Sequence, residues 1–183
     1  MIEDLSMHVA DLVLNALRAG ARRIDVVLER KGGRLILEVA DDGQGMTERE
    51  LERALDPFFT TKDRPEGIGL GLALARQTAE ELGGELFVRS FPGGGTRVRL
   101  SIPYEHPDRP PLGDLAGTLV PLMISSEGVE FTLRLADDHS TWVLDNKDVR
   151  VARGGDAPGY GLLSFLEAKV KEGLESIGLK EDA

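Results

Sequence analysis

Two glycine clusters, each with glycine at alternate positions, constrain this chain more than any other feature. In the first, Gly43 and Gly45 follow Asp41 and Asp42 directly after an apolar run that ends at Ala40. Because glycine lacks a Cβ, such a loop lets the backbone come close to a flat ligand. An ordinary Asp/Gly turn has the same composition. An acid at the end of a predicted strand therefore predicts either a ligand loop or a plain turn.

The second cluster spans residues 67–72 and has glycine at every other position. It stands at the entrance of a predicted helix over about 69–82, where free backbone N–H groups and the helix dipole favour an anion. It is not a P-loop, because the sequence contains no Gly-x-x-x-x-Gly-Lys-Ser/Thr. It is not the Rossmann loop either, because no predicted strand leads straight into it.

Hydrophobic periodicity and turn residues predict the secondary structure around these clusters. The order of helices and hairpins indicates an α+β fold, a two-layer α/β sandwich with helices on one face of a mixed sheet. The predicted elements are a helix over 3–19, strands over 24–30 and 34–40 joined by Gly32-Gly33, a short helix over 47–55 opened by a Thr47/Glu50 capping box, a helix over 69–82, and strands over 85–91 and 96–102.

Four prolines between residues 103 and 113 predict a semi-rigid linker. We therefore expect a first domain over residues 1–104, a linker over 105–113 and a small α+β domain over 114–183. This last part is predicted to be a β-meander plus a helix, and to contact a partner or a second copy of the chain. Its predicted elements are strands over 118–125, 129–136, 140–145 and 149–152 and a closing helix over 161–177.

Composition limits the classes of partner. A net charge of −10 lacks the basic footprint of a nucleic-acid binder. The chain has no cysteine, which excludes disulfides, cysteine–zinc sites and thiol catalysis and fits a reducing compartment. No apolar run approaches bilayer length, and the acidic start lacks the features of a signal peptide. We expect a cytoplasmic protein that binds neither nucleic acid nor membrane.

The first predicted helix carries a polar face opposite its apolar stripe. Asp11 and Asn15 are four residues apart and therefore share this face, with His8 and Arg18 nearby. A solvated surface would show the same pattern. The face is thus a candidate site only in combination with the glycine clusters.

Taken together, the motifs resemble those of the GHKL ATPase family, which includes sensor histidine kinases, gyrase, the heat-shock chaperone and MutL. The resemblance covers roughly residues 1–104. The segments 57–62 and 67–73 are most similar to histidine kinases, and the segment 15–25 is closer to MutL. The five matching motifs, in family order, are Asn15 (N box), Asp41-x-Gly43-x-Gly45 (G1), Pro57-Phe58-Phe59-Thr60-Thr61-Lys62 (F), Gly67-x-Gly69-x-Gly71-Leu72 (G2) and Gly95-Thr96 (G3).

This resemblance implies a Bergerat-type ATP-binding fold with ATP and Mg²⁺ as cofactors. Asn15 would be the Mg²⁺ ligand, and Asp41, supported by Thr96, would accept a hydrogen bond from the adenine 6-amino group. The loop from about 58 to 71 would form a lid over the nucleotide. The nucleotide-contacting residues implied are Asn15, Arg18, Asp41, Gly43, Gly45, Met46, Phe59, Thr61, Lys62, Gly67, Gly69, Leu70, Gly71, Leu72 and Thr96.

Asp11 departs from the family pattern. ATP-hydrolysing relatives carry a glutamate four residues before the asparagine, where it acts on water as a general base. An aspartate is one methylene shorter, so the resemblance implies a catalytic role for Asp11 with weak basal ATPase activity. Arg18 and Lys62 are either phosphate contacts or surface charges.

Three functions remain open at this point. The first is a stand-alone phosphotransferase, of histidine or Ser/Thr kinase type, or a slow regulatory ATPase. The motifs begin almost at Met1, so the phosphoacceptor would lie on a partner protein in trans, and His8 would help to frame the site. The second is a MutL-like conformational switch, and the third is a structural module that binds nucleotide without turnover. A homodimer is compatible with each.

Overall fold

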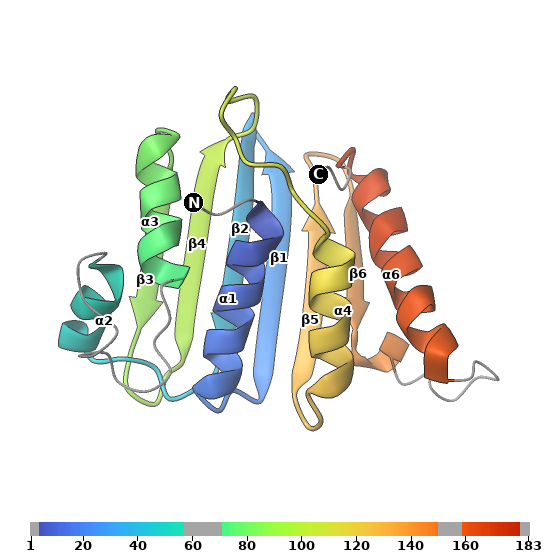
Figure 1. Ribbon diagram of the computed structural model, residues 1–183, viewed down its shortest axis with the longest axis horizontal. Helices are drawn as coiled ribbons and strands as arrows, with labels where there is room; N and C mark the ends of the chain where they lie inside the picture. The colour runs from blue at the N-terminus through green and yellow to red at the C-terminus, as the bar shows by residue number, and fades with distance from the viewer. Residues whose placement is uncertain (1–3, 57–70, 150–158, 180–183) are drawn as a thin grey trace.

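The computed structural model describes residues 4–56, 71–149 and 159–179. Within them, six strands form one mixed sheet in the order β3-β4-β2-β1-β5-β6, and α1, α3, α4 and α6 cover the same face of it (Figure 1). The helices are α1 Leu5–Arg18, α2 Glu48–Leu55, α3 Gly71–Glu81, α4 Leu115–Ser125 and α6 Gly159–Ser176. The strands are β1 Arg23–Lys31, β2 Arg34–Asp41, β3 Glu85–Ser90, β4 Thr96–Pro103, β5 Glu130–Ala136 and β6 Thr141–Asp145.

Helix α1 forms as its sequence pattern predicts. Asp4 caps its N-terminus, because the carboxylate accepts a hydrogen bond from the Met7 N–H at 3.0 Å. The residues at helical spacing are almost fully buried against the sheet, and each large aliphatic side chain contributes about 1.5–3 kcal/mol. They are Leu5, Val9, Leu12, Val13 and Ala16.

The local turn signals are also confirmed. Gly32 and Gly33 both have positive φ, as the two-residue turn of the β1–β2 hairpin requires. Thr47 and Glu50 form the predicted capping box at the start of α2, each side chain bonding the backbone N–H of the other residue.

The strand predicted over 118–125 is wrong, because these residues belong to helix α4. The segment is apolar throughout, so it has no period that separates a buried helix from a buried strand. The helix also contains Pro121, which lacks a backbone N–H and is unfavourable in a helix interior. Asp114 overrides these signals by capping the helix, accepting the Gly117 N–H at 2.8 Å. Of the strand predicted over 149–152, the described residue Val149 is helical, and the others lie outside the described residues.

The two strands and the closing helix of the C-terminal part form as predicted, but they are not a separate layer. β5 pairs with β1 in parallel, with Ile24 opposite Phe131 and Leu28 opposite Leu135. Strands that precede and follow the proline-rich segment in the sequence therefore belong to the same sheet. One hydrophobic core runs under all four helices.

The proline-rich segment is also attached to α1. The backbone N–H groups of Leu5 and Ser6 donate to the carbonyl oxygens of Pro111 and Leu112, each at 2.9 Å. These donors belong to the first turn of α1, where no partner exists inside the helix. The segment therefore completes the N-terminus of the helix that carries Asp11 and Asn15. None of the helices in the described part of the chain combines the length and hydropathy that a bilayer crossing requires.

Candidate functional site

A cavity opens between α1, the last residues of β2, the first residues of β4, the loop of residues 42–47 and the start of α3. It brings together residues that the sequence separates by more than 80 positions. Its lining is Leu12, Asn15, Ala16, Arg18, Ala19, Val39, Asp41, Gln44, Gly45, Met46, Glu50, Leu72, Thr96 and Val98. Of the residues proposed from sequence, Asn15, Arg18, Asp41, Gly45, Met46, Leu72 and Thr96 are in this lining.

Asp41 is the half-buried carboxylate of the cavity. Its Oδ1 accepts the Gly43 N–H at 2.8 Å, and the backbone N–H of Thr96, its partner across the β2–β4 pair, also bonds it. Burial raises the pKa of Asp41 above its ordinary value, although these hydrogen bonds oppose the shift. Beside it, Val39 and Val98 pair across the same two strands and give the cavity an apolar floor. The arrangement offers one strong acceptor at the edge of an apolar surface.

Ser90 holds the residues around this acceptor, and sequence reasoning missed it. Its hydroxyl is 2.8 Å from the Thr96 hydroxyl, accepts the Met46 N–H at 2.8 Å and donates to the Gly95 carbonyl at 3.1 Å. One serine at the end of β3 thus fixes both Thr96 and Met46. No motif pointed to it, because its contacts depend on the β3–β4 turn and on Met46, which is 44 residues away in the sequence.

Two glycines, Gly45 and Gly95, are required by the close packing of two loops near the cavity. Gly45 and Gly95 both have positive φ, and a Cβ on Gly45 would overlap the Phe91 carbonyl. A Cβ on Gly95 would overlap the Asp41 carbonyl. The loop after β2 and the β3–β4 turn can therefore approach each other only with glycine at these positions. Gly43 lies outside the cavity lining and packs against Ala19.

Asp11 and Asn15 share a face of α1, as predicted, but only Asn15 lines the cavity. Asp11 lies against the first residue of α3, where its Cβ would be 2.9 Å from a Cβ placed on Gly71. Burial raises the pKa of Asp11, and the positive charge of Arg18 lowers it in part. The carboxyl is thus held at the α1–α3 contact.

His8 is fully buried and connects α1 to α3, but it is not in the cavity lining, so its role in framing the site stays a prediction. Its Nε2 is 3.0 Å from the Thr78 hydroxyl. Nδ1 is buried with no partner among the described residues. Burial lowers the pKa of His8 to about 4, although the charge of Asp4 opposes this. His8 is therefore neutral at pH 7.

Several predictions fall outside the described residues, namely those for Phe59, Thr61, Lys62, Gly67, Gly69 and Leu70. The structure adds lining residues that sequence reasoning did not name. Leu12, Ala16 and Val39 could have been found from their places on the apolar stripes. Glu50 was assigned only to the capping box, where it accepts the Thr47 N–H at 2.7 Å, but its side chain also borders the cavity.

Residues 2–106 match the family described as histidine kinase-, DNA gyrase B-, and HSP90-like ATPase. The match spans more than half of the chain, so the chain belongs to this family and the predicted GHKL fold is confirmed.

Among individual proteins, the chain is 39% identical over 99 residues to the sensor histidine kinase GtrS of Pseudomonas aeruginosa, which covers 54% of this chain and 21% of that one. It is 35% identical over 111 residues to the sensor histidine kinase ZraS of Escherichia coli O157:H7, covering 60% of this chain and 24% of that one. The chain thus spans less than a quarter of the length of these two relatives.

A solved structure resembles a longer part of the chain. The N-terminal domain of a DNA repair protein superposes with a TM-score of 0.59 over 81% of this chain and 56% of that one. At 18% identity this likeness concerns the fold alone.

Proposed function

We propose that the cavity binds ATP as its Mg²⁺ complex, and that the chain acts as a kinase or regulatory ATPase on a partner protein in trans. The observation that carries the proposal is the half-buried Asp41 carboxylate at the edge of an otherwise apolar floor. Family membership supports it independently.

The cavity fits a purine base. Val39, Val98 and Leu72 supply apolar surface for a flat ring, and Asp41 supplies an acceptor for the adenine 6-amino group. A guanine would present its 6-oxo lone pair to the same carboxylate, which is repulsive. The site therefore selects adenine over guanine.

The polar residues of α1 and the start of α3 fit the phosphate end. Asn15 offers a hard amide oxygen to Mg²⁺, and Arg18 offers a positive charge, both from the cavity wall. α3 begins at Gly71, so its first N–H groups and its dipole favour an anion nearby. When bound, ATP supplies the transferable γ-phosphoryl group, and the residues of the chain contribute position and charge stabilisation.

Asp11 is the candidate general base. Its raised pKa makes the ionised carboxylate a better proton acceptor than an exposed aspartate. Its position against Gly71, outside the cavity lining, argues for weak ATP hydrolysis in the absence of a partner. The expected result is a slow basal rate that Asp11→Asn lowers further in single-turnover assays; an unchanged rate removes Asp11 from the role.

Calorimetric titration tests nucleotide binding directly. The wild-type chain should bind ATP and ADP with Mg²⁺ and should bind GTP more weakly, whereas folded Asp41→Asn should lose this preference. Equal affinity of wild type and Asp41→Asn for ATP would contradict the proposal.

The proposal of kinase activity rests on the similarity to sensor histidine kinases, which the chain matches over part of their length. Incubation with γ-³²P-ATP and a co-encoded candidate partner should label that partner. Labelling should disappear with Asn15→Ala. Tight ATP binding with no labelled partner would instead favour a module that binds nucleotide without transfer.

A second candidate is a nucleotide-driven switch. The observation that favours it is that the segment after the family match contacts the N-terminus of α1, the helix that carries Asn15, through Pro111 and Leu112, and contacts the turn after α1 through Glu130. X-ray scattering profiles that coincide with and without Mg·ATP would exclude a large rearrangement of this kind.

A further inference from the structure

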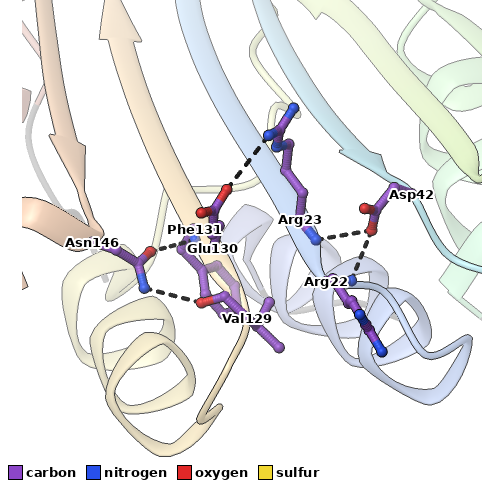
Figure 2. A network of polar contacts seen from close by, with 7 residues as sticks. All are labelled: Arg22, Arg23, Asp42, Val129, Glu130, Phe131 and Asn146. Atoms are coloured by element: carbon purple, nitrogen blue, oxygen red, sulfur yellow. Dashed lines mark hydrogen bonds and ion pairs between the residues drawn. The ribbon is translucent and has the colours of Figure 1, made fainter.

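Strand β5 belongs to the segment beyond the family match, yet it is connected to a wall of the cavity. That wall is the loop of residues 42–47, hereafter the G1 loop, and Gln44, Gly45 and Met46 of this loop line the cavity. The connection runs through the turn between α1 and β1, as Figure 2 shows.

Asp42 fastens the G1 loop to this turn. Its Oδ1 accepts the backbone N–H groups of Arg22 at 2.7 Å and of Arg23 at 2.8 Å. Its own N–H donates to the Arg23 carbonyl at 3.3 Å, and the Gln44 N–H donates to the Ala19 carbonyl at 2.9 Å. The hydrogen bonds to Asp42 lower the pKa of its carboxyl, so the group is ionised and these bonds are charge-assisted at neutral pH.

Glu130, the first residue of β5, holds the other side of the same turn. Its N–H donates to the Arg22 carbonyl at 2.7 Å. Its carboxylate lies 3.4 Å from the Arg23 guanidinium, but this pair is exposed and contributes little energy. Arg22 therefore uses both its backbone groups as a bridge, giving its N–H to Asp42 and its carbonyl to Glu130.

Asn146 fixes Glu130 from beyond the end of β6. Its Nδ2 donates to the Val129 carbonyl at 2.9 Å, and its Oδ1 accepts the Phe131 N–H. In Figure 2 this side-chain amide spans the two residues that flank Glu130, on the side away from Arg22. The amide holds the start of β5 at two points, one on each side of the residue that contacts the turn.

We infer that Asn146 is a positioning residue for the nucleotide site. It holds the start of β5, Glu130 then holds the turn at Arg22, and Arg22 with Arg23 holds Asp42 and the G1 loop. The inference rests on the proposed nucleotide binding and assigns a role to residues outside the family match. Coupling of this kind is reciprocal, so nucleotide also stabilises the start of β5.

The test is calorimetric titration of the full chain with Mg²⁺ and the non-hydrolysable analogue AMP-PNP. Asn146→Ala removes both hydrogen bonds and should raise the Kd by about fivefold or more, the lower end of couplings between sites. Asn146→Asp keeps the acceptor for Phe131 but sets a carboxylate against the Val129 carbonyl, and should also raise the Kd. This second variant carries the test if the alanine variant does not fold.

Asp137→Ala is the matched control at the opposite end of β5. Asp137 accepts the backbone N–H groups of His139 at 2.8 Å and Ser140 at 2.6 Å, so its loss removes a comparable set of hydrogen bonds. It should lower the melting temperature but leave the Kd unchanged. A Kd that rises equally in Asp137→Ala and Asn146→Ala would show a general stability effect and overturn the inference.

Amide exchange followed by NMR provides a readout in the wild-type chain alone. Addition of AMP-PNP should slow exchange of the Glu130 and Phe131 amides, and exchange that is unchanged at saturation overturns the inference. Absence of AMP-PNP binding by the wild-type chain would contradict the proposed function itself. A wild-type Kd for AMP-PNP in folded Asn146→Ala or Asn146→Asp would contradict only the positioning role of Asn146.

Discussion

The buried His8 makes the stability of the fold depend on pH in a way that can be calculated. His8 is fully buried, and its pKa is lowered from 6.5 to about 4. In the unfolded chain its pKa returns to about 6.5, so the unfolded state binds the extra proton first. The stability that neutral His8 provides is therefore fully present above pH 6.5 and is lost as the pH falls toward 4.

The magnitude follows from the two pKa values. Between pH 7.5 and pH 5 the linkage amounts to about 2 kcal/mol of unfolding free energy, and it rises to about 3 kcal/mol at pH 4. The protonated ring carries an N–H on both nitrogens, and Nδ1 has no partner for it among the described residues. That effect acts in the same direction.

Urea unfolding of wild type and His8→Gln at pH 7.5 and pH 5 measures this quantity. Glutamine is neutral at both values and can keep a hydrogen bond to Thr78, which wild-type His8 contacts at 3.0 Å. Other titrating groups affect both chains alike, so the difference between the two chains isolates His8. The difference should change by about 2 kcal/mol in favour of the variant at pH 5. Parallel pH profiles for the two chains would refute the reasoning.

Three further predictions concern the cavity and its loops. The pKa of Asp41 is raised and adenine needs an ionised acceptor, so ATP affinity should fall on acidification at a higher pH than for an exposed aspartate. Asp41→Asn should lack this contribution, and the difference between the two chains in titrations between pH 4.5 and 7.5 checks it, because the phosphates of ATP titrate alike with both. Gly95 has positive φ, and a Cβ there would overlap the Asp41 carbonyl, so Gly95→Ala should lower the unfolding free energy by at least about 1–3 kcal/mol in urea melts. Gly93 also has positive φ but has open space around it, so Gly93→Ala should lower the unfolding free energy by less. Thr47→Ala removes one half of the capping box and should cost about 1 kcal/mol without changing nucleotide selectivity.

Local signals explain which elements could be predicted from sequence. The apolar stripe of α1, the Gly32-Gly33 turn and the Thr47/Glu50 box each act within a few residues, and the structure contains all three. The segment 118–125 lacked such a signal, since a continuous apolar run fits a helix or a strand equally well until its packing partners are known.

Long-range pairing explains what sequence reasoning missed. The parallel register of β5 on β1 joins residues more than 100 positions apart, and no local pattern encodes it. Ser90 and Asn146 act only through partners from other segments, so a hydroxyl and an amide in unremarkable surroundings gave no signal. At the cavity, Asn15, Asp41 and Thr96 could be proposed because their motifs resemble those of the GHKL family, and the structure brings them to one cavity.

The parallel pairing of β1 with β5 also bears on how the chain is made. β1 is complete once residue 31 has been synthesised, but its second neighbour spans residues 130–136, so one edge of a central apolar strand stays open during most of translation. A fragment cut at residue 104 would keep that edge open permanently and would uncover the side of α1 that α4 contacts. We expect such a fragment to self-associate or bind chaperones, although it contains nearly all of the family match.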